Sequence, residues 1–299
     1  MNGTQSMLSC FNPAARRIGE TFAYCVLFVV SLVGNTLIGF IVYKTKTLQK
    51  PINFFIVNMA MSDLLFPIFL FPRELVSSHS DSFPWLIGGT LGEVLCKLVP
   101  FAIDISTSVS ILSLVLIAVD RFEAVVFPLR FLLISSKQCR FFVLATWIIA
   151  MAVHCPHLLV LKVVEHQKKL LCVIQLDGVF GDYLSHLNYM TALSVAFFYV
   201  PLALISVLYT AIALKIKLQK TPGEQTASGR DQRLKRERHV IKMSVAIVLV
   251  FAVCSLPRGI WWFLRRFSSD RTMLSCFVPL TSPAANVFSK DIAAFHKCQ

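Results

Sequence analysis

Seven apolar stretches recur along the chain, each bounded by polar or charged residues. A helix that crosses the hydrocarbon core of a membrane needs about 20 mostly apolar residues. Six stretches come close to or exceed this length, and the seventh is shorter and contains Pro279 and Pro283. The pattern predicts an all-α, seven-transmembrane helical bundle, with helices over residues 21–43, 53–70, 97–119, 141–161, 183–214, 243–264 and 272–288.

The stretches contain few charges. The second and third each carry one internal aspartate, Asp63 and Asp104, and the sixth carries Arg258. Hydrophobic residues make up 56% of the 299 and charged residues only 15%, which is too little charge to cover the surface of a soluble domain of this size. Composition therefore also indicates a multi-pass membrane protein.

Basic residues indicate the orientation. With the N-terminus outside, 18 of the 29 Lys and Arg residues fall in inner connections and 11 in outer ones, as the positive-inside rule requires. Residues 1–20 lack an apolar core, so the first helix is expected to serve as the insertion signal. The tripeptide from Asn2 to Thr4 is a glycosylation sequon, which agrees with an outside location. We expect an extracellular N-terminus over 1–21, a transmembrane domain over 22–288 and a short cytoplasmic tail over 289–299.

The net charge of +13 does not indicate a nucleic-acid partner. Basic residues concentrate between residues 215 and 242, where they would face anionic lipid of the inner leaflet and any cytoplasmic partner. A nucleic-acid domain would need a folded basic face, and the inner connections are too short to form one.

Individual residues and short motifs recur in order, with at least one in most spans. They are Gly34-Asn35, Asn58 with Asp63, Trp85, Cys96, Asp120-Arg121-Phe122, Pro128-Leu129, Trp147, Pro201, Tyr209, Phe251, Cys254 and Pro257. Cys96 and Arg121 lie 25 residues apart. These motifs and this spacing resemble the rhodopsin-like G-protein-coupled receptors. The first three spans resemble neuropeptide receptors most. The resemblance implies a plasma-membrane receptor for a peptide-like ligand, coupled to a heterotrimeric G protein, and not an enzyme.

The resemblance also implies a disulfide and a sodium site. A disulfide is expected between Cys96 and Cys172, which would lie at the oxidising outer face. A sodium ion is the one cofactor expected, and it would lie near Asp63 and Ser110. Alternatively, Asp63 only forms a structural hydrogen bond between helices. The expected sodium and activation core comprises Asp63, Ser110, Asn35 and Asn286.

Arg121 is expected at the inner end of the third helix. The family pattern pairs it with Asp120 at rest, and Glu237 at the base of the sixth helix is a second candidate partner. Release of the arginine would accompany an outward swing of the sixth helix, with Tyr209 taking part. Alternatively, Arg121 has no switch role and only extends its guanidinium to the lipid headgroups. Residues 289–295 are expected to form a short amphipathic helix, with palmitoylation at Cys298 or an unmodified thiol there.

The expected ligand pocket comprises Ile103, Asp104, Ser255, Arg258 and Trp262. Ile103 occupies the position where amine receptors carry an aspartate, and Asp104 is turned about 100° from it on the helix. An amine ligand is therefore not expected. Arg258 should face the bundle interior, where it could pair with Asp104 or receive an acidic group of the ligand. Trp262 is either a pocket wall or part of an interfacial aromatic belt.

Other classes are less consistent with the chain. A transporter or channel would show paired broken helices or a filter loop. A membrane enzyme would need a cluster of reactive groups, and the candidates His154 and His157 are interpreted as headgroup-level residues without acidic partners. Two departures from the family matter more: Ser255 stands where the family has tryptophan, and residues after Asn286 look as if a few had been lost. A receptor-like protein with impaired or no G-protein coupling is therefore the main alternative.

Overall fold

The computed structural model describes residues 13–48, 51–79, 85, 87–127, 136–166, 169–175, 181 and 183–218, together with 242, 245, 246, 248 and 249. Five helical segments in these ranges are long and apolar enough to cross a membrane: Thr21–Lys44, Ile52–Pro72, Gly89–Val126, Gln138–Val160 and Ser185–Ile216. They confirm the first five predicted spans. The sixth and seventh predicted spans lie outside the described residues, apart from the five single positions in and beside the sixth.

The first two spans differ in regularity. Helix α1 (Pro13–Lys44) is continuous and is followed by the short 3-10 helix η1 (Lys46–Leu48). The second span consists of two helices, α2 (Pro51–Asp63) and α3 (Leu65–His79), with a turn at Leu64. Pro67 explains the interruption, because it has no N–H to donate to the carbonyl of Asp63 four residues earlier.

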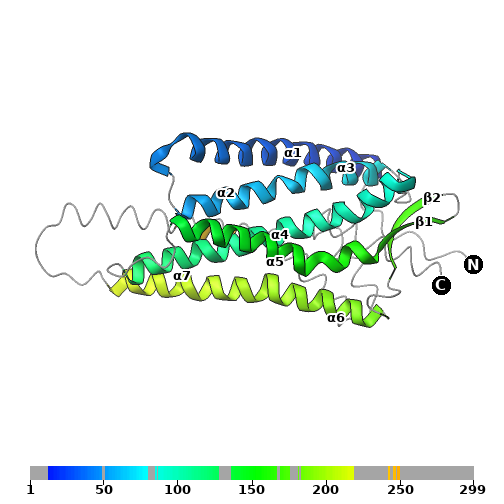
Figure 1. The fold of residues 1–299 in the computed structure, drawn as a ribbon. Coiled ribbons are helices and arrows are strands. Elements are labelled where there is room, and N and C mark those ends of the chain that lie inside the picture. The colour runs from blue at the N-terminus through cyan, green and yellow to red at the C-terminus, as the bar shows by residue number, and fades with distance from the viewer. Residues whose placement is uncertain are drawn as a thin grey trace, which may run out of the picture.

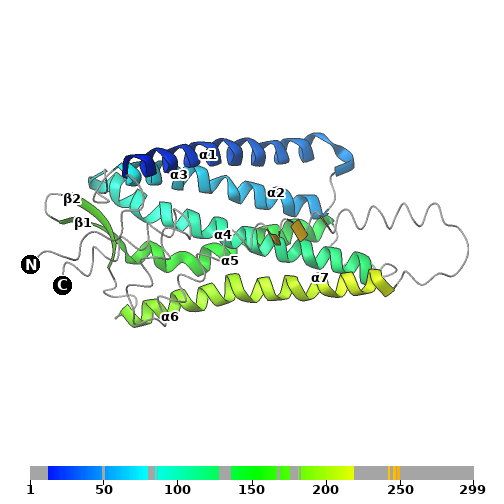
Figure 2. The same cartoon turned by 180° about the vertical axis from the view of Figure 1, so that it is seen from behind.

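Helix α4 (Gly89–Val126) is the axis of the bundle. Its 38 residues extend about 57 Å at 1.5 Å per residue, well beyond a hydrocarbon core of about 30 Å. It is the most buried of the membrane-length helices and packs against α2, α5 (Ser136–Val160) and α7 (Val200–Leu218). Figures 1 and 2 show α4 between α2 and α7 from opposite sides.

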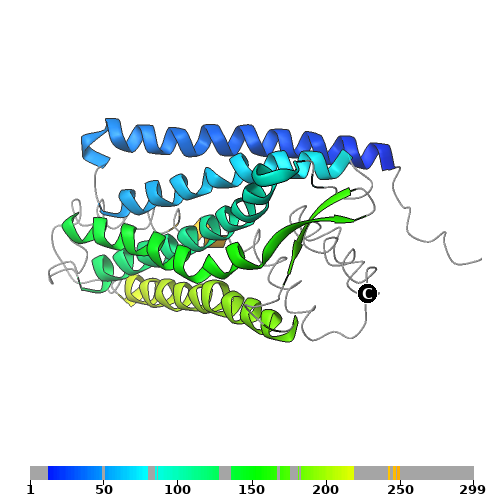
Figure 3. The same cartoon turned by 45° about the vertical axis from the view of Figure 1, so that its right-hand side comes forward.

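The expectation of an all-α chain was incomplete. Strands β1 (Leu161–His166) and β2 (Lys169–Ile174) form an antiparallel hairpin, with Leu161 opposite Ile174 and His166 opposite Lys169. The hairpin follows α5 directly and extends across one end of the bundle (Figure 3), which we call the hairpin end. The opposite end, where α1 and α7 finish, is called the far end.

The fifth span is also interrupted. Helix α6 (Tyr183–Ser194) leads into a π-helical turn, η2 (Val195–Tyr199), before α7 begins. Pro201 cannot donate to the carbonyl of Phe197, so the backbone widens just ahead of it. Beyond this turn, α7 packs against α4 in an apolar cluster formed by Leu114, Ala118, Val125, Ile205, Tyr209, Ile212 and Val248. Val248 places part of the sixth stretch against these two helices.

Candidate functional site

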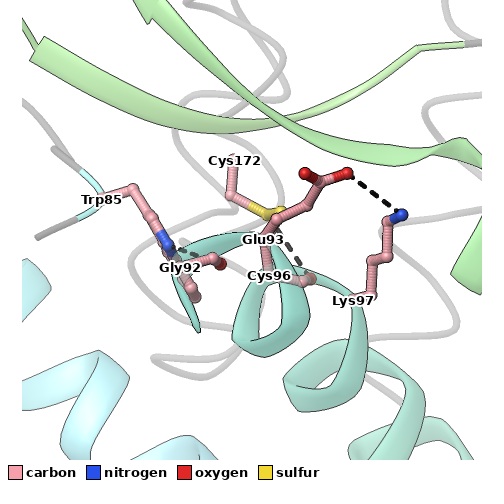
Figure 4. Close-up of a disulfide and its surroundings, with 6 residues drawn as sticks. All are labelled: Trp85, Gly92, Glu93, Cys96, Lys97 and Cys172. Atoms are coloured by element: carbon pink, nitrogen blue, oxygen red, sulfur yellow. Dashed lines mark hydrogen bonds and ion pairs between the residues drawn. A yellow bond between two sulfur atoms is a disulfide. The ribbon is translucent and has the colours of Figure 1, made fainter. Parts of the chain in front are cut away.

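A disulfide joins the hairpin to the first turns of α4. Cys96 and Cys172 are bonded, with their Cα atoms 5.7 Å apart, and Cys172 lies opposite Val163 in the hairpin (Figure 4). The predicted pairing is confirmed. Because 76 residues separate the two cysteines, the bond holds β2 over the hairpin end of the bundle.

Trp85 packs close to the disulfide. Its indole N–H donates to the carbonyl of Gly92 at 2.9 Å, and its backbone N–H donates to the carbonyl of Leu170 in β2 at 2.5 Å. Gly92 has no room for a side chain, since a Cβ there would lie 1.8 Å from the carbonyl oxygen of Ile87. These contacts connect the segment before α4 with both the helix and the hairpin.

A polar network crosses three helices at mid-bundle. The amide nitrogen of Asn58 on α2 donates to Ser113 on α4 at 2.9 Å and to Thr146 on α5 at 3.2 Å. Its amide oxygen accepts a hydrogen bond from the indole of Trp147 at 2.8 Å. Asn58, Ser113 and Thr146 are all buried, so these bonds satisfy polar groups that have no access to water.

Asp63 and Ser110 meet as predicted. The Ser110 hydroxyl lies 2.5 Å from a carboxylate oxygen of Asp63 and 2.9 Å from the hydroxyl of Ser62. Three oxygen-bearing side chains from α2 and α4 thus converge, which is the chemistry that a hard cation such as sodium requires. Asn35 makes its hydrogen bonds within α1, to the carbonyl and the hydroxyl of Ser31. Its place in the cation core therefore stays a prediction.

Toward the far end of α4, Arg121 pairs with the neighbouring Asp120. The guanidinium donates to one carboxylate oxygen through Nη2 at 2.6 Å and through Nε at 3.1 Å. The Asp120 side chain is buried, whereas that of Arg121 is partly exposed. Loss of this arginine would leave a buried carboxylate without the charge that pairs with it, which is costly in free energy.

Tyr209 lies on α7 in the apolar cluster beside Ala118 and Val125 of α4. Its side chain is buried. Partly buried Phe122, next to Arg121 in sequence, packs on this cluster as well. The structure therefore brings the predicted switch residues of α4 and α7 into one region.

Ile103 and Asp104 point in different directions. Ile103 is buried against Leu70 and Val99, between α3 and α4. Asp104 faces α5, where its carboxylate lies 2.8 Å from Nδ1 of His157. The interpretation of His154 and His157 as lacking acidic partners was wrong, because Asp104 contacts His157. Both histidines are buried against neighbouring helices, and their place at the headgroup level stays a prediction.

Several predicted site residues lie outside the described part of the chain. They are Asn2, Glu237, Ser255, Arg258, Trp262, Asn286 and Cys298. The roles assigned to them stay predictions, as does pairing of Arg258 with Asp104.

Sequence reasoning missed Ser113 and Thr146, which bond to Asn58, and Ser108, whose hydroxyl lies 2.8 Å from Nε2 of His154. Ser113, Thr146 and Ser108 are small polar residues in apolar helices, and such residues commonly make bonds between membrane helices. The three residues could have been noticed by that rule. Their particular partners depend on how α2, α4 and α5 are rotated against one another, which periodicity does not determine.

Helices of membrane length, a disulfide at the hairpin end and an Asp–Arg pair toward the far end define a multi-pass helical membrane receptor. Residues 34–290 match the model of the family described as "7 transmembrane receptor (rhodopsin family)". The chain belongs to this family, as the motifs indicated. The family is one of multi-pass membrane receptors.

Curated relatives are receptors named for peptides. The chain is 32% identical to a QRFP-like peptide receptor of Branchiostoma floridae over 253 residues, which cover 82% of this chain and 64% of that protein. It is 28% identical to the RYamide receptor of Tribolium castaneum, over 86% of this chain and 71% of that one. It is 31% identical to neuropeptide FF receptor 1 of Rattus norvegicus, over 79% of this chain and 55% of that one. The chain thus spans between about half and 71% of the length of these relatives.

Proposed function

We propose that the protein is a G-protein-coupled receptor that binds an extracellular peptide and transmits that event to a heterotrimeric G protein. The observation that carries the proposal is the position of the Asp120–Arg121 pair on α4, the same helix that bears Cys96. One rigid helix thus connects the tethered hairpin with an ion pair at the opposite side of the membrane. The relatives are named for RYamide, neuropeptide FF and QRFP-like peptides, which supports a peptide of that kind as ligand.

The hairpin end is the extracellular end in this proposal. The distribution of basic residues supports an outside N-terminus, and a disulfide is stable in the oxidising compartment outside the cell. The fold would be a seven-helix bundle in the plasma membrane, with 1–21 outside, 22–288 in the membrane domain and 289–299 forming a short amphipathic tail. Asn2 would be glycosylated and Cys298 palmitoylated.

Signal transfer would depend on two arrangements of Arg121. At rest, the guanidinium is held by Asp120 at 2.6 Å. A ligand that binds better to the active arrangement would shift the population toward released Arg121 and an opened sixth helix. Tyr209 would then line the opened cleft, and Glu237 would be a second resting partner of the arginine. Ser255, Arg258 and Trp262 would face the peptide, whereas Ile103 is buried between α3 and α4 and would support the pocket from behind.

Sodium would favour the resting arrangement. Asp63, Ser110 and Ser62 offer oxygen atoms within one buried cluster, which supports a cation there. Asn35 and Asn286 would complete the core.

A second candidate function is a receptor-like protein with impaired coupling. Ser255 replaces the bulky tryptophan of the family, and the stretch over 272–288 would be only about 25 Å long as a helix, less than a hydrocarbon core of about 30 Å. Both departures would remove contacts that differ between the resting and active states. A loss of about 1.4 kcal/mol would already lower the active-to-resting ratio tenfold.

One experiment separates these functions. The chain is expressed at the surface of cells, and RYamide, neuropeptide FF and QRFP-like peptides are tested for binding and for G-protein activation. A second version carries Ser255→Trp and an inserted proline and tyrosine after Asn286. Binding with activation in the unaltered chain supports the receptor; binding with activation only in the altered chain supports impaired coupling. Absence of binding to all three peptides in both versions contradicts a peptide ligand of this kind.

A further inference from the structure

We propose that Asp104, His154 and His157 form a zinc site between α4 and α5. One ligand atom from each of the three side chains can be chosen so that all three atoms lie within 4.8 Å of one another. Among the residues that the structure describes, these are the three that meet in this way. The proposal does not depend on the proposed peptide ligand or on G-protein coupling.

The two histidines share one face of α5. They are three residues apart, so their side chains emerge from adjacent turns, and their ring centroids lie 6.0 Å apart. Asp104 approaches from α4, with a carboxylate oxygen 2.8 Å from Nδ1 of His157. Two helices thus supply the three ligands, which a metal ion would clamp together.

Little movement is needed to bind the ion. Zinc bonds to imidazole nitrogen and carboxylate oxygen are about 2.0–2.2 Å long, so two ligands on a tetrahedral zinc lie roughly 3.4 Å apart. The separation of at most 4.8 Å would need to shrink by about 1.4 Å at most, which side-chain rotation can supply. A water molecule would take the fourth position.

Ser108 is placed to orient His154, as an oxygen beside a metal-bound histidine usually does. Its hydroxyl lies 2.8 Å from Nε2 of His154. Metal-bound histidines usually donate their second ring N–H to an oxygen, which fixes the tautomer and directs the other nitrogen to the metal. If Nε2 of His154 donates to Ser108, Nδ1 carries the lone pair that zinc requires.

The surroundings keep the three side chains in place. The ring of Phe197 in η2 lies 6.1 Å from that of His154, and Tyr189 on α6 donates to the carbonyl of Val153 on the adjacent turn of α5. His154 and His157 are buried, and the Asp104 side chain is only 17% exposed. A buried carboxylate needs compensating positive charge, and a divalent ion supplies it more completely than a shared proton.

The ligand set favours zinc over other ions. Two imidazoles and one carboxylate suit zinc, whereas calcium and magnesium prefer six or more oxygen ligands. The site lies close to one end of α5. His157 is three residues before that end, about 4.5 Å along the helix axis, and the hairpin follows directly.

Zinc titration of the purified full-length protein tests the proposal. The protein must carry a purification tag without histidines, and binding is measured by calorimetry with zinc, calcium and magnesium chloride. We expect one zinc ion per chain, reversed by a chelator, no comparable binding of calcium or magnesium, and a melting temperature that rises with zinc concentration. Asp104→Asn and His157→Asn should each weaken zinc binding at least about tenfold. His166→Asn, at the turn of the hairpin, is the matched control and should bind zinc as the unaltered protein does.

A second measurement needs no variant. Hydrogen exchange at the imidazole C2 position, read by mass spectrometry, should slow on zinc addition at His154 and His157 but not at His166. This result would support the site even if Asp104→Asn failed to fold. The proposal is overturned if the unaltered protein binds no stoichiometric zinc, if Asp104→Asn folds and binds zinc equally well, or if protection appears at other histidines instead.

Discussion

Trp147 on α5 donates its indole N–H to the amide oxygen of Asn58 on α2 at 2.8 Å, although 89 residues separate them. The same asparagine donates to Ser113 on α4 and to Thr146 on α5. One side chain thereby fixes the mutual rotation of three helices. Lipid tails are as apolar as leucine, so such polar bonds and close packing determine how membrane helices associate.

Replacing this asparagine should loosen the bundle. Asn58→Leu keeps a similar volume but removes three bonds to other helices, each worth about 0.6 kcal/mol on average in membrane proteins. We expect a loss of roughly 2 kcal/mol, measured as a lower melting temperature of the purified protein in detergent. Asn188→Leu, at an exposed position of α6, is the matched control. Equal effects of the two substitutions would show that the Asn58 network contributes nothing.

The disulfide should stabilise the hairpin end of the bundle. Cys172→Ser breaks a link across 76 residues, for which chain entropy sets an upper limit of about 4.5 kcal/mol. We expect lower surface expression and a lower melting temperature. Cys155→Ser removes an exposed free thiol and should change neither. Peptide mapping without reduction gives a direct check, since recovery of Cys96 as a free thiol in folded protein would refute the bond.

Gly92 should tolerate no side chain. A Cβ at this position would lie 1.8 Å from the carbonyl oxygen of Ile87, which is backbone and cannot rotate away. Gly92→Ala should therefore displace the segment before α4 together with Trp85, and the yield of monodisperse protein should fall. Gly39→Ala has open space around its Cβ and serves as control. Normal yield of Gly92→Ala would mean that the segment at Ile87 is not held as the structure has it.

Sodium should stabilise the protein through Asp63. In sodium chloride we expect a higher melting temperature than in choline chloride at the same ionic strength, since only the small cation can bind the oxygen cluster. Ser110→Ala removes one oxygen and should abolish the difference. Thr107→Ala, whose hydroxyl bonds to Ile103 within α4, should preserve it. If sodium raises the melting temperature of Ser110→Ala as much as that of the unaltered protein, there is no sodium site. Asp63 and Ser110 then only form a structural hydrogen bond between helices.

The first five helices were predictable because hydrophobic length alone identifies a membrane span. Features that depend on neighbouring elements were not. The Leu64 turn and the π-helical turn at Val195–Tyr199 reflect prolines whose effect on a helix varies with its surroundings. The hairpin is absent from the all-α prediction, because neither strand shows a regular alternation of apolar and polar residues. The acidic partner of His157 was not predicted, because Asp104 lies 53 residues away on another helix.

The resemblance supplied what periodicity could not. Pairing of Cys96 with Cys172 and proximity of Asp63 to Ser110 followed from family motifs, and both are present. Asn35 illustrates the limit, because a motif places a residue on a helix without determining its rotamer. In this structure its amide bonds back to Ser31, one turn earlier on α1.

The central claim, that the Asp120–Arg121 pair holds the receptor at rest, is tested most directly by basal G-protein activation. Nucleotide exchange is measured without ligand for the unaltered chain, Asp120→Asn and Glu93→Gln at equal surface density. Glu93 is also a carboxylate on α4, paired with Lys97 at the hairpin end, so its replacement should leave activation unchanged. Asp120→Asn should raise basal activation, up to about tenfold if the lost pair contributes 1.4 kcal/mol. Basal activation of Asp120→Asn equal to that of Glu93→Gln would contradict the account.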